Sequence, residues 1–349
     1  MTSPAEQRLE LLHRSARFIV TVMTPVGVAF ATGAQPWLVY AVLGAIVAFL
    51  GDEGGKPVLR FGYMLVGPGA LVAGATIGSI VRTDSIFVAI TVLLGLFYGL
   101  VEGGGSHLLL IARFGGYGLV LGFAVAHLKF ADAIATGTAV LVAWIVSLAW
   151  DIARRRLREL SVEPVLTSLW CAVVAWRSRW IFALAAGLSI GAANVVGLWM
   201  GRGHSYWATL TILVVLRADL LESADAITHR VSGTLLGVAA MAVLISCTSN
   251  PDVRFAAMVI VAALRWPALS MHLTLGTACI TAFVLLVADL LAVSPSAEMH
   301  VLQDRLAAIM VGCCFALVGL GLQREIARVV RPRWQTTARE TSYRTPSSG

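Results

Sequence analysis

The chain of 349 residues is 58% hydrophobic and 13% charged, with a mean hydropathy of +0.84 and a formal net charge of +7. Soluble domains carry about 25% charged residues, so this composition excludes a soluble catalytic or nucleotide-binding domain and a secreted disulfide scaffold. Lys and Arg in a membrane protein report orientation before nucleic acid. We therefore expect an all-α polytopic membrane protein whose surroundings are the lipid bilayer, with no nucleic acid partner.

Apolar runs separated by charged residues predict about twelve transmembrane helices, since each span needs about 20 apolar residues. In chain order the predicted spans are 16–34, 36–51, 60–81, 85–101, 106–127, 132–150, 180–200, 205–217, 229–248, 253–265, 268–290 and 300–322. If both termini are cytoplasmic, most of the 26 Lys and Arg residues fall on the cytoplasmic side. The positive-inside rule therefore predicts cytoplasmic termini.

The two halves of the chain resemble each other, which predicts two parallel six-helix repeats. The matched pairs at an offset of 170 are Trp37 with Trp207, Asp52 with Glu222, Arg60 with Arg230 and Gly67 with Gly237, and residues 151–154 match 325–328. The predicted domains are a first repeat at 1–150, a cytoplasmic amphipathic linker at 151–178, a second repeat at 179–323 and a basic cytoplasmic tail at 324–349. Residues 164–176 are apolar but short, so the alternatives of a span and a segment lying on the membrane stay open.

The second span of each half is short, and short spans in matching positions point to a transport pathway. The alternative is that both are tilted core helices. Small residues four apart predict close helix packing. They occur at Gly74/Gly78, Gly118/Gly122, Gly187/Gly191 and Gly233/Gly237.

Charges inside or beside the membrane are the chemically informative residues, because charges are costly there and line aqueous paths. Arg113 lies within a predicted span, and Arg60, Arg217 and Arg230 lie at predicted cytoplasmic span ends. Guanidinium groups match carboxylates in a bidentate manner, so these arginines are candidate anion contacts. Retention of topology and pairing with nearby Asp and Glu residues are the alternatives.

Histidines at span ends are proton-relay candidates, because their pKa lies near physiological pH. The candidates are His204, His107 and His272, together with Asp289. Recognisable catalytic motifs and metal-ligand spacings do not occur in the sequence, so we expect no enzyme activity, no catalytic residues, no cofactor and no metal.

The stretch from His204 to Arg217, followed by Ala226 and His229 to Gly237, resembles the FUSC family of fusaric-acid-resistance and aromatic-acid-exporter-like membrane proteins. It is also similar to a helix pair of the plant aluminium-activated malate transporters. The resemblance implies an inner-membrane protein that exports aromatic or other weak organic acids and is driven by the proton gradient. The candidate pathway residues are Trp207, Tyr206, Thr209, Arg217, Arg230, Trp37, Arg60 and Arg113.

Three functions stay open at this stage. A secondary exporter of a small organic anion leads, a passive organic-anion channel is the alternative, and a non-transport envelope scaffold is the third. The sequence leaves open the substrate and whether the partners include a second copy of the chain, as a homo-oligomer, or a periplasmic adaptor.

Overall fold

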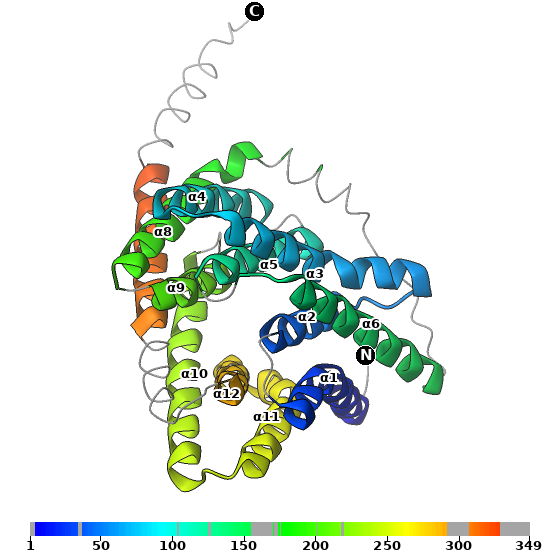
Figure 1. Cartoon of the computed structure of the whole chain (residues 1–349). Coiled ribbons are helices and arrows are strands. Elements are labelled where there is room, and N and C mark those ends of the chain that lie inside the picture. Colours follow the sequence, from blue (N-terminus) through cyan, green and yellow to red (C-terminus); the bar gives the residue numbers. More distant parts are fainter. Residues whose placement is uncertain are drawn as a thin grey trace, which may run out of the picture.

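The computed structural model describes residues 4–33, 37–102, 105–124, 127–154, 170, 174, 176–200, 202–217, 220–291 and 307–328, and within these ranges the regular elements are all helices. Figure 1 shows them as one bundle. The prediction of an all-α polytopic membrane protein is confirmed. The predicted linker and most of the predicted tail lie outside the described residues.

Every predicted span coincides with a helix. The helices are α1 (Pro4–Thr32), α2 (Leu38–Leu50), α3 (Pro57–Ile80), α4 (Asp84–Val101), α5 (Ser106–Ala124), α6 (Phe130–Ala153), α8 (Trp176–Met200), α9 (Arg202–Val215), α10 (Leu220–Cys247), α11 (Pro251–Met271), α12 (Leu273–Leu291) and the C-terminal helix (Ala307–Arg328). Eight of the described helices are long and apolar enough to cross a membrane, while α2, α5 and α12 contain shorter apolar helices. Helices α1 and α10 begin before their predicted spans, because their polar first turns are helical without being apolar.

The prediction places a break between residues 265 and 268, but α11 continues to Met271 with Pro267 inside it. A proline lacks one backbone donor and usually kinks or ends a helix. Here the break falls at His272, whose extended backbone separates α11 from α12.

The predicted short spans are short helices. Helix α2 has 13 residues and α9 has 14, which gives each a length of about 20 Å at 1.5 Å per residue. Most of the side chains of α2 are buried, since α1, α3 and α6 surround it. A helix that is apolar on all sides belongs in a protein interior, so α2 is enclosed by the bundle.

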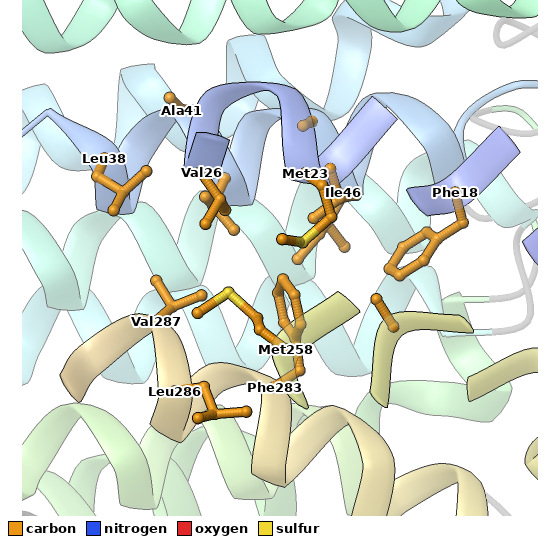
Figure 2. Close-up of a cluster of buried hydrophobic side chains, with 14 of the residues drawn as sticks. Phe18, Met23, Val26, Leu38, Ala41, Ile46, Met258, Phe283, Leu286 and Val287 are labelled. Carbon is orange, nitrogen blue, oxygen red and sulfur yellow. The ribbon is translucent and has the colours of Figure 1, made fainter. Parts of the chain in front are cut away.

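Two large apolar clusters join helices from both halves. Figure 2 shows side chains of α1 and α2 facing those of α11 and α12 across the first cluster. Its labelled members are Phe18, Met23, Val26, Leu38, Ala41, Ile46, Met258, Phe283, Leu286 and Val287. The second cluster joins α4, α5, α8, α9, α10 and the C-terminal helix.

The predicted close approach of glycine-rich helices is confirmed for α3 and α5. A Cβ on Gly74 would collide with the Gly115 carbonyl, and a Cβ on Gly118 would collide with the Leu71 carbonyl. The two glycine pairs thus face each other across one interface. This contact fixes α5 against α3 and sets the position of the polar side chains that α5 carries.

Polar contacts join helix ends that the predicted topology places on one side. Arg154 pairs with Glu10 at 3.1 Å, and His107 lies 3.3 Å from Glu53. We call this end of the bundle, which also carries Asp52, the basic end. It corresponds to the predicted cytoplasmic side.

Candidate functional site

The end of α9 is held by two tyrosines from the first half of the chain. The fully buried Tyr98 of α4 donates a hydrogen bond of 2.6 Å from its hydroxyl to the carbonyl of Leu216. Tyr117 of α5 donates a longer one, 3.5 Å, to the carbonyl of Leu210. Both carbonyls lie near the end of α9, where neighbouring helical donors are running out.

Three of the candidate arginines converge on these tyrosines. The guanidinium carbon of Arg113 lies 5.9 Å from the centre of the Tyr98 ring. The charges of Arg113 and Arg217 act on the Tyr98 phenol, and those of Arg113 and Arg230 act on the Tyr117 phenol. We call these five residues the arginine–tyrosine cluster.

Two of these arginines have buried nitrogens without a hydrogen-bond partner among the described residues. They are Nε and Nη2 of Arg113 and Nε of Arg230. Burying a charged donor without a partner is costly, and a guanidinium presents a planar fork that matches a carboxylate. Apolar side chains of the second cluster surround the group, including Leu213, Ile227 and Cys313. The arrangement can therefore bind an anion that carries an apolar or aromatic body.

Arg60 lies elsewhere, in a closed ion cluster at the basic end. It is 2% exposed, and it donates to both oxygens of Asp52 at 2.6 and 2.8 Å and to Asp151 at 2.6 Å. Arg17 pairs with Asp52 at 3.1 Å, and the Ser147 hydroxyl donates to Asp52 at 2.8 Å. Two carboxylates already occupy the Arg60 fork. The arrangement matches the alternative of structural pairing.

The electrostatics of this ion cluster centre on Asp52, which lies in the turn between α2 and α3. Burial raises the pKa of its carboxyl, but hydrogen bonds from Arg60 and the charges of Arg17 and Arg60 outweigh burial, and Ser147 adds a further hydrogen bond. The pKa of Asp52 is therefore held below its usual value, and the carboxylate is charged at neutral pH.

Thr209 and Trp37 take positions apart from the arginine–tyrosine cluster. Thr209 donates to the side-chain oxygen of Asn194 at 2.9 Å, and both residues are fully buried. This bond ties α9 to α8. Trp37 packs at the edge of the first apolar cluster.

Four candidates fall in helices, but their side chains lie outside what the structure describes. They are His204, Tyr206 and Trp207 in α9 and Asp289 in α12.

The two remaining histidine candidates each meet a second titratable side chain. His107 is buried, stacks on Tyr63 with 4.7 Å between ring centres, and pairs with Glu53. His272 meets His229 edge-on at 5.1 Å, and Nδ1 of His229 lies 2.8 Å from the Thr274 hydroxyl. Both pairs belong to the turns that connect neighbouring helices.

Sequence reasoning missed the two tyrosines of the cluster. One signal was present for Tyr117, because it follows Arg113 by four residues and such residues share a helix face. Tyr98 has no such signal, since its contact with Leu216 joins residues 118 apart in the chain.

A separate hollow of about 210 Å³ lies at the opposite end of the bundle from the basic end. Its lining residues are Phe30, Ser249, Pro251, Arg254, Phe255, Met258 and Leu286. It is bounded by the end of α1 and the turn between α10 and α11, and Phe30 and Phe255 stack there at 4.8 Å.

Residues 190–319 match the model of the fusaric acid resistance protein-like family. An uncharacterized protein of Synechocystis sp. is 26% identical over 139 residues, which cover 38% of this chain and 18% of that relative. The chain thus matches less than a fifth of that relative's length. No solved structure shows significant similarity. The matched region holds Arg217 and Arg230, while Arg113 and both tyrosines come from the preceding half.

Proposed function

We propose, because residues 190–319 belong to the fusaric acid resistance protein-like family, that the chain is a membrane transporter that exports aromatic or other weak organic acids. We further propose that the proton gradient drives export and that the protein lies in the inner membrane with both termini in the cytoplasm. A homo-oligomer and a periplasmic adaptor stay predictions.

One observation carries this proposal: buried donors of Arg113 and Arg230 have no partner among the described residues. Weak organic acids are anions in the cytoplasm, and a carboxylate between the two guanidinium groups would supply the missing acceptors. The family match and the arginine–tyrosine cluster therefore point to the same class of ligand.

The surroundings of the arginines favour an acid with an aromatic or apolar body. Tyr98 and Tyr117 offer ring faces, and Leu213 and Ile227 offer apolar surface. Small-ligand sites combine an apolar lining with a few polar groups that fix orientation. In this proposal the arginines select the charge and the rings select the body.

The titratable pairs at the basic end are the candidates for proton coupling. The pair of His107 and Glu53 joins the start of α5 to the turn between α2 and α3. A histidine can exchange a proton near neutral pH. We propose that protonation of this pair accompanies transport, because α5 carries both His107 and Arg113.

Transport into inverted membrane vesicles tests the proposal. We expect uptake of labelled p-hydroxybenzoate or fusarate when a proton gradient is imposed, and loss of most uptake in Arg113→Ala and Arg230→Ala. Arg254→Gln is the matched control, since Arg254 lies at the opposite end of the bundle and donates to the Thr248 carbonyl.

Flux that ignores the gradient would replace the exporter by a passive channel. Absence of flux with aromatic and dicarboxylic acids alike, from vesicles that contain folded protein, would contradict the transport proposal.

A further inference from the structure

A second group of arginines lies at the basic end, between α1, α2 and α11, away from the arginine–tyrosine cluster. The guanidinium carbon of Arg14 lies 3.8 Å from the centre of the Trp266 ring, and that of Arg265 lies 5.1 Å from it. Arg265 is also 5.1 Å from the Phe18 ring, and Arg17 is 4.9 Å from the Phe49 ring. We call Arg14, Arg17 and Arg265 with these three rings the arginine–tryptophan cluster.

Buried donors of this cluster have no acceptor among the described residues. Trp266 is 6% exposed, and its Nε1 has no hydrogen-bond partner there; the same holds for Nη1 of Arg265. Buried indole N–H groups normally find a partner. The shortage is therefore one of acceptors, which is what an anion supplies.

Positive charge is concentrated here without matching carboxylates. The charge of Arg14 acts on Arg265, so the two cations repel each other across Trp266. The carboxylate of Asp52 is bound by Arg60 and Arg17, and Glu10 pairs with Arg154. An anion beside Arg14 and Arg265 would relieve this repulsion.

Helix packing alone does not require these residues. At the sequence offset of 170, the contact of α1 with α11 corresponds to the contact of α8 with α4. There the two helices meet through Gly95 and Gly187, and a Cβ on Gly95 would lie 2.7 Å from the Cα of Gly187. A tight glycine contact thus does in one half what the cluster surrounds in the other.

We infer that the arginine–tryptophan cluster binds the phosphate of an anionic phospholipid headgroup. Basic pockets between transmembrane helices on the cytoplasmic side are suited to anionic headgroups, and Trp and Arg favour the membrane interface. Exposed apolar side chains flank the cluster where acyl chains would lie. These are Leu9 and Leu12 on α1 and Met271 on α11, which are 52%, 60% and 77% exposed.

Lipid binding to the purified full chain tests the inference. Native mass spectrometry in detergent would count bound dioleoylphosphatidylglycerol against dioleoylphosphatidylcholine, and thermal unfolding would compare each lipid with inorganic phosphate. The variants are Arg14→Gln, Arg265→Gln and the double variant. Arg254→Gln is the matched control, because Arg254 lies on the same helix α11 but at its other end.

We expect each single variant to weaken phosphatidylglycerol binding about fivefold and the double variant about 25-fold, since each basic residue near an anionic headgroup contributes about that factor. The control should bind as the unchanged chain does. Arg265→Lys should retain most binding, since it keeps the charge. Because Arg14 is exposed, Arg14→Gln is expected to fold even if Arg265→Gln does not.

Three results would overturn the inference. Phosphatidylcholine could bind as tightly as phosphatidylglycerol, or Arg254→Gln could lose as much binding as Arg14→Gln. Equal stabilisation by inorganic phosphate would assign the site to a free anion and remove the lipid. Transport of organic acids is measured separately, so the failure of either proposal leaves the other standing.

Discussion

Arg60 and Arg230 match at the sequence offset of 170, yet their surroundings differ. Arg60 is enclosed by Asp52 and Asp151, whereas Arg230 keeps a buried Nε without a partner among the described residues. The sequence predicts both as anion contacts, because both follow an acidic residue by eight positions. What separates them is a contact across 91 residues, from Arg60 to Asp151, that spacing does not reveal.

Substitution should separate these two arginines. Arg60→Ala leaves Asp52 and Asp151 buried without their cation, and breaking a buried ion pair costs about 3–5 kcal/mol. Arg230→Ala removes a charge that is costly to bury, so its melting temperature should be unchanged or higher. Thermal unfolding in detergent, paired with vesicle uptake, checks this. A folded Arg60→Ala protein with the original melting temperature would contradict the assignment of Arg60 as structural.

The low pKa of Asp52 makes the ion cluster sensitive to acid. The folded-state pKa lies below the usual value of about 3.9, so the stabilisation is complete above that value and is lost as the pH falls through the folded-state pKa. The melting temperature should therefore fall below about pH 4 in the unchanged chain. Asp52→Asn should be less stable at neutral pH and lose less on acidification. Parallel loss in both proteins would show that other carboxylates govern the acid response.

At the scale of the helices, apolar length predicts each element because a span must exclude water along its whole length. The boundaries deviate where polar residues continue a helix, as in the first turns of α1, and where Pro267 is absorbed into α11. The glycine pairs predict close packing, but their pairing of α3 with α5 depends on the fold. The tertiary partner of each helix face is the part that sequence periodicity leaves open.

The interface between α3 and α5 should tolerate no added methyl group at its centre. A Cβ on Gly74 would collide with the Gly115 carbonyl, whereas a Cβ on Gly69 of the same helix meets nothing within 4 Å. We expect Gly74→Ala to destabilise the protein by about 1–3 kcal/mol through overpacking. Gly69→Ala should be neutral or stabilising by up to about 1 kcal/mol. Thermal unfolding of the two variants gives the comparison, and equal melting temperatures would contradict the predicted collision.

At the scale of the whole molecule, the two halves exchange helix contacts. Under the offset of 170, the packing of α3 with α5 corresponds to that of α10 with α12, and the packing of α4 with α8 corresponds to that of α11 with α1. The second correspondence joins the halves, so each half buries a helix of the other. We propose that this is how the predicted repeats assemble, and it explains why the arginine–tyrosine cluster draws Tyr98 and Arg113 from one half and Arg230 from the other.

Cross-linking between α1 and α11 tests whether this exchange occurs within one chain. The rings of Phe30 and Phe255 lie 4.8 Å apart, so cysteines at both positions should form an intramolecular disulfide in a background without the native cysteines. Phe30→Cys with Ile86→Cys is the control, because Ile86 lies on α4, which packs against α8 and α5. Gel mobility after oxidation in membranes separates the outcomes. A disulfide that joins two chains would mean that α1 packs on the α11 of another copy, and the arginine–tyrosine cluster would then be reassigned to a dimer in which the halves are exchanged.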